Sequence, residues 1–381
     1  MKQINTMDNA YLAALCALPG LGRAKLPSML QALGSAQAVY EADAEALNSL
    51  ELVKPEAVAT FISKRRSDLP KKIAYYCNQQ GVQLLSYRDE GYPRSLLRIA
   101  DPPLLLYVKG TLPKAAYCLA VVGSRACTEY GKKAARLFTK DLAAHGIPII
   151  SGGARGIDTI AHETCLKAGG QTVAVLGCGL DIAYPEENAL LFERIVNSGG
   201  AVISEYAPGT RPLAQHFPAR NRIIVGLSQG VLVAEARLKS GAIITANIAA
   251  DEGREVYCVP GNIFDRSSMG CHELIRTGAK LVDTSQHILE DKADWELARR
   301  ERITQPSIFD YLPEVQEEAA PAVRVSALGK HLLELLQAGS CSLEELVEQS
   351  DADFASVSME ILELQGAGLV AQNQLLRYYL R

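Results

Sequence analysis

A series of short apolar runs alternates with helix-like stretches through the middle of the chain, and this alternation constrains the fold more than any other feature. The runs are rich in valine, isoleucine and leucine, and we predict strands at 117–123, 147–151, 172–177, 201–206, 230–236, 255–261 and 279–282. Near-continuous apolar strands joined by helical crossovers predict a mostly parallel sheet that is covered on both faces. The predicted fold class is therefore α/β, with an extended Rossmann-like, doubly wound domain.

The chain is long enough for more than one domain, because 381 residues exceed an ordinary single core. We expect a helical domain over 1–85, the Rossmann-like domain over 86–292, a polar linker over 293–325 and a winged-helix domain over 326–381. In the first domain "LPGLGRAK" is typical of a helix-hairpin-helix or SAM-like fold, although an ordinary turn between two helices fits it equally well. In the last domain, three short helices precede a two-stranded hairpin.

Cysteine usage and the lengths of the apolar stretches indicate the cellular compartment in which we expect the protein. Its nine cysteines are scattered and include no C-x-x-C pair, which argues against a disulfide framework and a zinc module and favours a reducing cytoplasm. No apolar stretch approaches the ~20 residues that cross a bilayer, and the first residues show no signal-peptide cleavage pattern. We therefore expect a cytoplasmic protein that has no membrane partner.

The predicted strand ends carry glycine-rich polar segments, among them "GSR" (123–125), "SGGARGID" (151–158) and "KSGAIITA" (239–246). Ligands of such sheets bind beyond the carboxyl ends of the strands, so we expect these segments to line one crevice. The first strand is not followed by G-x-G-x-x-G, and no G-x-x-x-x-G-K-[ST] occurs, which argues against dinucleotide binding and P-loop hydrolysis. Backbone amides and cations remain, and both bind phosphates.

A basic segment lies within a chain whose formal net charge is −4. Between residues 201 and 250 there are five cations, including Arg220, Arg222 and Lys239, and two acids, so that this segment carries 5 − 2 = +3. The segment "KSGA" alone could bind a mononucleotide, because it leads into a helix whose first N–H groups are free and form the positive end of the helix dipole. The further cations favour a strand of nucleic acid.

Several long motifs occur in one order, namely "VVGSR", "SGGARGIDTIAH", "FPARNRII", "KSGAIITA", "VPG" and "GCHELIRTGAKLV". In this the chain resembles the DNA-processing protein A family (DprA, also called Smf), throughout the middle domain and more loosely in the outer ones. The resemblance implies a non-enzymatic protein that binds single-stranded DNA, protects incoming strands in natural transformation and helps to load the RecA recombinase. It also implies a homodimer that forms through the Rossmann-like domain, and it implies no cofactor.

Carried over to matching positions, the resemblance implies that Arg125 and Lys239 are the principal phosphate contacts. Their chemistry agrees, because Arg125 offers a planar fork to phosphate oxygens and Lys239 offers a compact charge. Between these contacts we expect backbone amides to donate, those of Gly123, Ser124, Gly152, Gly153, Gly241 and Ala242. In "SGGARGID" we expect the glycines to let the backbone approach the ligand and Arg155 to add charge or brace the loop. For Asp158 we expect it to hold the loop by capping the next helix rather than to contact the ligand. The predicted DNA-binding residues are Gly123, Ser124, Arg125, Gly152, Gly153, Arg155, Arg220, Arg222, Lys239, Ser240, Gly241 and Ala242.

Histidine and aromatic side chains near the predicted crevice can be explained by structural roles as well as by contacts with DNA. His216 and His272 are each as consistent with a hydrogen bond to a loop as with a DNA contact. Tyr206 and Phe217 are candidates for base stacking. Core packing is the commoner fate of such side chains, and we expect it here.

No catalytic or metal site is expected. Asp158 and His162 stand four residues apart on a predicted helix, but they lack a third ligand. Two rival functions use the same crevice. A nucleotide-processing enzyme of the lysine-decarboxylase-like group is disfavoured because its P-G-G-x-G-T motif is missing. A nucleotide-binding sensor remains open.

The C-terminal region is acidic where a winged helix would meet DNA. Between residues 331 and 373 there are eight acids and no lysine or arginine. A recognition helix that contains Asp353, Glu360 and Glu363 would repel phosphates. We therefore expect this domain to contact another protein or to have a regulatory role rather than to bind DNA.

Overall fold

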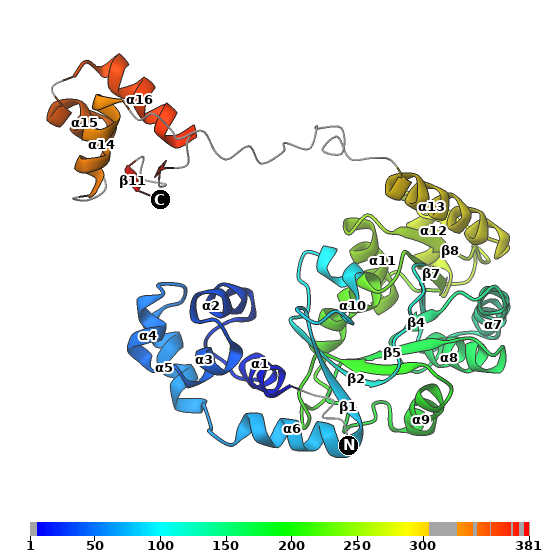
Figure 1. The fold of residues 1–381 in the computed structure, drawn as a ribbon. Helices are drawn as coiled ribbons and strands as arrows, with labels where there is room; N and C mark the ends of the chain where they lie inside the picture. Colours follow the sequence, from blue (N-terminus) through cyan, green and yellow to red (C-terminus); the bar gives the residue numbers. More distant parts are fainter. Residues whose placement is uncertain are drawn as a thin grey trace. The chain divides into compact units, whose positions relative to one another are not determined.

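A nine-stranded sheet forms the centre of the first part of the chain (Figure 1), and its strands follow the spatial order β1-β2-β6-β5-β4-β3-β7-β8-β9. Strands β3 to β9 pair in parallel, whereas β1 and β2 form an antiparallel edge. The order runs outward from β3 in both directions, so that the switch point of the sheet lies between β3 and β7. The strand bounds are β1 Val82–Ser86, β2 Leu105–Gly110, β3 Leu119–Gly123, β4 Ile149–Ser151, β5 Thr172–Leu176, β6 Ala201–Ser204, β7 Gly230–Glu235, β8 Glu255–Cys258 and β9 Lys280–Leu281.

The computed structural model describes residues 6–304, 326–337, 341–350, 352–366, 369–372 and 377–380. The chain divides into two compact units, Met1–Arg299 and Arg300–Arg381. In the described part of the chain, no helix is both long enough and apolar enough to span a membrane.

Helices cover both faces of the central sheet (Figure 1). Successive strand residues point to opposite faces, so Val121 packs under α7 and α8 while Val122 packs under α10, α11 and α12. This explains why the strands are apolar without alternation. The helix bounds are α7 Glu129–Ala144, α8 Ile157–Lys167 and α9 Ala189–Asn197 on one face, and α10 His216–Gly226, α11 Gly241–Asp251 and α12 Met269–Arg276 on the other.

The prediction of a mostly parallel α/β fold is confirmed, since each predicted strand of the middle region has its counterpart among β3 to β9. The strands β1 and β2 were not predicted. They pair antiparallel at one edge and have no helical crossover between them, so the alternation of strand and helix patterns does not reveal them. The predicted domain boundary at 85/86 consequently falls inside β1.

Short helices precede the sheet, as predicted, and pack on its antiparallel edge. Their shared core includes Phe61 together with Leu84 of β1 and Tyr107 of β2. Side-chain oxygens of Thr6, Ser35 and Asp43 cap three of the helices by accepting from backbone N–H groups. The bounds are α1 Met7–Ala17, α2 Leu26–Leu33, α3 Ala36–Glu41, α4 Ala44–Ser49, α5 Pro55–Lys64 and α6 Leu69–Gln80.

The glycine pair in the turn between α1 and α2 has a structural explanation. Gly20 adopts φ +117°, and a Cβ atom there would lie 2.5 Å from the carbonyl oxygen of Ala57 in α5. Leu21 is buried, whereas Gly22, at φ +72°, has open space around it. The turn therefore packs closely on α5 at Gly20, and both interpretations of this segment stay predictions.

From residue 326 on, the described part of the second unit contains three helices followed by an antiparallel strand pair, the order of elements that the sequence predicts. Its core includes Leu332, Leu346 and Val357. The helix α13 Gln286–Thr304 covers the beginning of the predicted linker, and 305–325 lie outside the described residues. The bounds are α14 Ala327–Gln337, α15 Leu343–Ser350, α16 Phe354–Gly366, β10 Val370–Gln372 and β11 Tyr378–Leu380.

We predict that Gly20→Ala destabilises the protein by about 2 kcal/mol or more, because a methyl group would collide with α5 at a positive φ. Gly22→Ala is the matched control. It shares the positive φ but meets no neighbouring atom, so its cost should be about 1 kcal/mol. Thermal unfolding of both variants measures the difference, and equal melting temperatures would contradict the packing argument.

Candidate functional site

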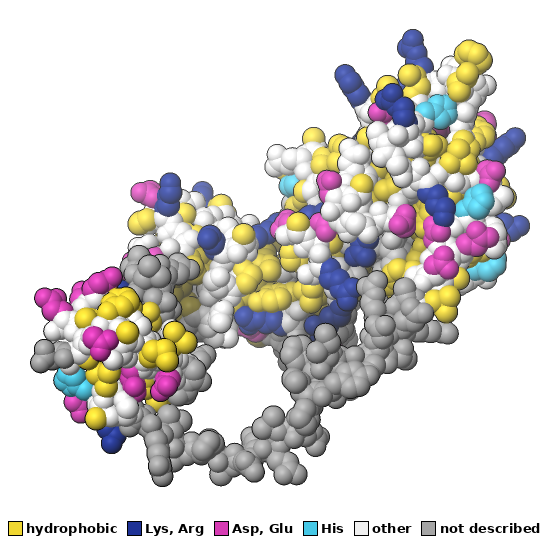
Figure 2. All heavy atoms as spheres, turned by 90° about the horizontal axis from the view of Figure 1, so that it is seen from above, with side chains coloured by type: hydrophobic (Ala, Val, Ile, Leu, Met, Phe, Trp, Pro, Cys, Tyr) yellow, Lys and Arg dark blue, Asp and Glu magenta, His cyan; other side chains and the backbone are white. Residues whose placement is uncertain are grey.

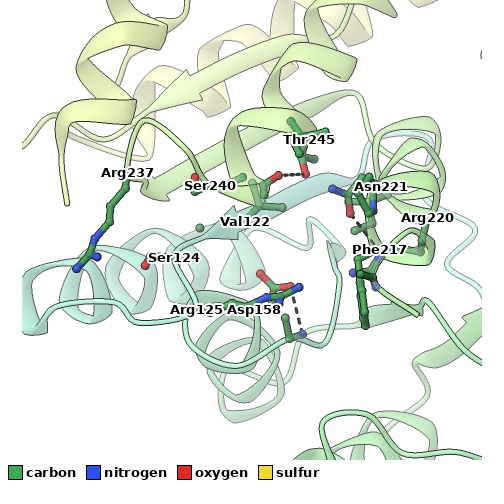
Figure 3. A pocket seen from close by; sticks show the side chains of 18 of the residues that line it. Val122, Ser124, Arg125, Asp158, Phe217, Arg220, Asn221, Arg237, Ser240 and Thr245 are labelled. Carbon is green, nitrogen blue, oxygen red and sulfur yellow. Dashed lines mark hydrogen bonds between the residues drawn. The ribbon is translucent and has the colours of Figure 1, made fainter. Parts of the chain in front are cut away.

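A cavity of about 570 Å³ opens at the carboxyl ends of β3 and β7, where the strand order reverses (Figure 3). The loops that follow β3 to β7 line it, together with the first turns of α8, α10 and α11. Because the switch point separates two crossovers that leave in opposite directions, the helices there diverge and leave room for a ligand. The predicted residues that line it are Gly123, Ser124, Arg125, Arg220, Lys239, Ser240, Gly241 and Ala242.

Three exposed cations line the cavity: Arg125 after β3, and Arg237 and Lys239 after β7. The guanidinium carbon of Arg125 lies 5.3 Å from the ring centre of Phe217, close enough for a cation–π contact. This contact places Arg125 at the cavity and leaves its N–H groups available for an anion. The three cations together favour a ligand that carries negative charge.

The beginning of α11 adds uncharged donors to the cavity. Ser240 precedes the helix in an extended conformation and makes no capping hydrogen bond, and among the described residues its buried hydroxyl has no partner. A Cβ atom at Gly241 would meet only open space. The first N–H groups of a helix lack partners within it, so those of Gly241 and Ala242 can bind a phosphate that Lys239 also attracts.

The segment "GSR" contributes side chains rather than the backbone amides that we expected. The Ser124 amide donates to the Glu235 carbonyl (2.9 Å), and the Ser124 carbonyl accepts from the Ile157 amide (3.2 Å). A Cβ atom at Gly123 would lie 2.5 Å from Cγ1 of Ile157. Gly123 is therefore needed for close packing of β3 on α8, and the expectation that the Ser124 amide binds the ligand is wrong.

The glycines of "SGGARGID" likewise serve packing within the protein, and their contact with the ligand stays a prediction. A Cβ atom at Gly152 would lie 2.6 Å from the Arg220 guanidinium. At Gly153, which has φ +65°, it would lie 2.8 Å from the ring of Phe192, and at Gly156 it would lie 2.3 Å from the Ser124 carbonyl oxygen. Close neighbours therefore leave no room for a Cβ atom at these three positions of the loop.

Arg220 and Asp158 are buried neighbours of opposite charge that both line the cavity. The Arg220 guanidinium donates to the carbonyl oxygens of Gly152 (2.7 Å) and Val175, and the Asp158 carboxylate accepts from the Ala154 amide (3.3 Å). Burial raises the pKa of Asp158 to about 6, against the opposing effect of the Arg220 charge. Burial lowers the pKa of Arg220 to about 10. Asp158 holds the loop through the Ala154 amide and does not cap α8 as we expected, and Arg220 supports the loops as well as lining the cavity.

Arg155 and Arg222 do not line the main cavity. Arg155 pairs with Glu187 (Nη2 to Oε2, 2.7 Å), so of its two predicted roles the structure shows the bracing one. Arg222 donates to Glu205 (2.8 Å) and to Asp101 (2.8 Å). Two residues along a helix differ by about 200° in direction, so Arg220 and Arg222 leave α10 on opposite sides. The prediction that Arg222 lies in the crevice is wrong.

His216 and His272 contact loops, which is one of the two interpretations that the sequence left open for them, and Tyr206 is packed as we expected. His216 contacts the Gly177 carbonyl (3.2 Å) and stacks on Tyr206, which is buried. His272 contacts the Gly261 carbonyl (3.0 Å). His162 contacts the Thr172 hydroxyl (2.7 Å). No group of three potential metal ligands occurs among the residues that the structure describes.

Arg237 and Tyr184 are among the cavity residues that were missing from the predicted set. Arg237 stands two residues before Lys239 on the same loop, so its charge was a usable signal. Tyr184 lies in "DIAYPEEN", after β5, and nothing in that segment marks it as a ligand contact. Its position at the cavity follows only from the course of the loop.

Known proteins match this chain over the region that carries the cavity. The family described as DNA recombination-mediator protein A matches residues 83–293. DNA processing protein DprA of Streptococcus pneumoniae is 49% identical over 207 residues, which cover 54% of this chain and 73% of the relative. Protein Smf of Synechocystis is 32% identical over an alignment of 395 residues, which covers 98% of this chain and 99% of the relative.

Solved structures agree with the sequence matches. The X-ray structure of DprA from Streptococcus pneumoniae has a TM-score of 0.63 and 37% identity, and the match covers 75% of this chain and 97% of that one. DNA processing protein A from Helicobacter pylori, described for its single-stranded DNA binding mode, has a TM-score of 0.50 and 29% identity. That match covers 56% of this chain and 96% of the other.

We predict that the buried His162 makes the protein sensitive to acid. Burial, with the nearby Arg220 charge, lowers its pKa from 6.5 to about 3, so between these values the unfolded chain binds more protons and stability falls as the pH falls. His162→Gln should lose less stability between pH 7 and pH 5 in urea unfolding. Asp158 acts in the opposite direction but is present in both proteins.

The control for this comparison is His145→Gln, because His145 is exposed. It should keep the pH dependence of the parent. An equal loss of stability in the parent and in His162→Gln would contradict the assignment.

Proposed function

The chain belongs to the DNA recombination-mediator protein A family, and we propose that it binds single-stranded DNA in the cavity between β3 and β7. The observation that carries the proposal is the convergence of Arg125, Arg237 and Lys239 with the open beginning of α11. A single strand is held by a basic groove that follows its phosphates, with aromatic side chains for its bases. The relative from Helicobacter pylori is described as binding single-stranded DNA, which supports the proposal.

A binding role is proposed rather than a catalytic one. Asp158 is the acid that lines the cavity, and it is buried, accepts from the Ala154 amide and faces the charge of Arg220. A general base needs access to its substrate, and these contacts occupy the carboxylate. The cavity chemistry is therefore that of phosphate capture.

The biological role follows from the family. We propose that the protein acts in natural transformation and recombination in the cytoplasm, protects incoming strands and helps to load the RecA recombinase. Dimerisation through the Rossmann-like domain belongs to the same proposal. Its support is the family membership together with the parallel sheet that carries the cavity.

We propose that the second unit does not bind DNA. Glu344, Glu348, Asp353 and Glu363 are exposed there, and exposed carboxylates repel the phosphate backbone. Glu345 pairs with Arg377 (2.7 Å), which reduces the positive charge that this unit could offer. A chain that ends at Ala320, remains folded and no longer binds single strands would refute this.

We predict that Arg125→Ala combined with Lys239→Ala weakens binding of a labelled oligothymidylate by at least about tenfold, because two phosphate contacts are lost. The slope of log affinity against log salt should become shallower by about 1.4, which is about 0.7 for each single-strand phosphate contact. Fluorescence anisotropy across a salt series measures both quantities.

The matched control is Lys133→Ala combined with Arg136→Ala, which removes the same charge from an exposed face of α7. It should bind as the parent does. Equal binding by the cavity variant and the parent would refute the site. Displacement of the strand by a mononucleotide at comparable concentration would favour a nucleotide sensor instead.

A further inference from the structure

The second unit carries an apolar stripe on α16, apart from the side chains that fix this helix in the unit. Phe354, Met359 and Leu362 form the stripe and are 57%, 65% and 68% exposed. The same helix buries a separate set of side chains in the core of the unit, namely Val357, Ile361 and Leu364. Large apolar side chains are usually buried, so three exposed ones on a helix of 13 residues indicate an interaction surface.

The exposed side chains lie along one side of α16. At about 100° per residue, Phe354, Leu362 and Met359 leave the helix within an arc of about 140°. Phe354 and Leu362 are separated by about two turns, which is about 12 Å at 1.5 Å per residue. The stripe therefore has the size of the surface that one helix offers to another.

Carboxylates border the stripe. Glu363 follows Met359 by one turn of α16, Asp353 directly precedes Phe354, and both acids are exposed. The Ser356 hydroxyl (2.6 Å) and amide (3.1 Å) donate to Asp353 and lower the pKa of its carboxyl, so that it is ionised at neutral pH. No lysine or arginine occurs in the sequence between residues 331 and 373. The border of the stripe is therefore negative.

The negative border indicates which occupant the stripe accepts. A strand of DNA is repelled by the carboxylates. A second copy of α16 would bring the same carboxylates against Asp353 and Glu363, and like charges across an interface are unfavourable. A helix with apolar anchors at i, i+3 or i+4 and i+7, and with lysine or arginine beside them, matches both the apolar stripe and its charge.

We propose that Phe354, Met359 and Leu362 form a docking surface for a basic amphipathic helix of another protein. The apolar side of that helix packs on the stripe, and its cations pair with Asp353 and Glu363. The apolar contact supplies most of the affinity, while the exposed ion pairs select the partner and its orientation. This role does not depend on the DNA-binding cavity, so either proposal can fail alone.

The test uses the full chain and a fluorescein-labelled model helix of sequence LKKLLKKLLKKL, whose leucines lie on one side. The comparison peptide SKKSSKKSSKKS carries the same charge and has no apolar side. In fluorescence anisotropy, the parent should bind the leucine peptide at least about tenfold more tightly, because burial of the leucines adds to the charge attraction.

Met359→Gln combined with Leu362→Gln removes most of the stripe, leaves the charge unchanged and keeps a good helix former at both positions. This variant should bind the leucine peptide at least about tenfold more weakly than the parent. Glu363→Lys should weaken binding about threefold, because one exposed ion pair is replaced by a repulsion. The matched control is Leu137→Gln combined with Leu190→Gln, which alters exposed leucines of α7 and α9 and should bind as the parent does.

If the double glutamine variant of α16 unfolds, Leu362→Gln alone provides the same comparison. Equal binding of the two peptides by the parent, or of the leucine peptide by the parent and the glutamine variant, would overturn the proposal. Dimerisation of the parent that the glutamine variant loses in light scattering would also overturn it, because a second copy would then occupy the stripe. Arg125→Ala combined with Lys239→Ala should leave peptide binding unchanged, and a loss of peptide binding there would place the peptide away from α16.

Discussion

The buried Arg220 guanidinium is the contact on which the rest of the site depends. From α10 it reaches the end of β5 at Val175 and the loop after β4 at Gly152, beside the carboxylate of Asp158. A buried cation that loses its acceptors is strongly unfavourable, so this contact fixes the loops relative to the helix. The loops that carry Arg125, Arg237 and Lys239 therefore stand beside a wall of the cavity that is fixed in position.

The arginines of this region divide into those that are paired within the protein and those that are exposed at the cavity. Arg155 and Arg222 are engaged by carboxylates, and Arg220 by carbonyl oxygens. Arg125 and Arg237 are exposed at the cavity. Figure 2 shows one face of the molecule, on which lysine and arginine side chains gather in places although the formal net charge of the chain is −4. Local arrangement therefore decides what the protein attracts, and the net charge does not.

The sequence predicted the parallel part of the sheet well, because buried parallel strands are apolar throughout and differ clearly from the helices that separate them. The edge strands β1 and β2 were missed because their pairing is antiparallel and local. The roles of individual residues were harder to predict. Gly123 and Gly152 follow strands as phosphate-binding glycines do, yet they are required by contacts with Ile157 and Arg220, which are distant in sequence.

The same limit applies to the cations and to Tyr184. A partner such as Glu187 or Glu205 can be identified only once the chain is folded, so Arg155 and Arg222 looked as available as Arg125. Helical geometry alone, however, would have placed Arg222 on the side of α10 opposite Arg220. Tyr184 carries no sequence signal at all, and its place at the cavity depends on the loop after β5.

The most direct test of the account is a crystal structure of the protein with a short oligothymidylate bound. The account predicts a phosphate within hydrogen-bonding distance of the Gly241 and Ala242 amides, with the Lys239 ammonium and the Arg125 guanidinium beside the same strand. A strand bound on another face of the molecule, with the cavity between β3 and β7 empty, would contradict it.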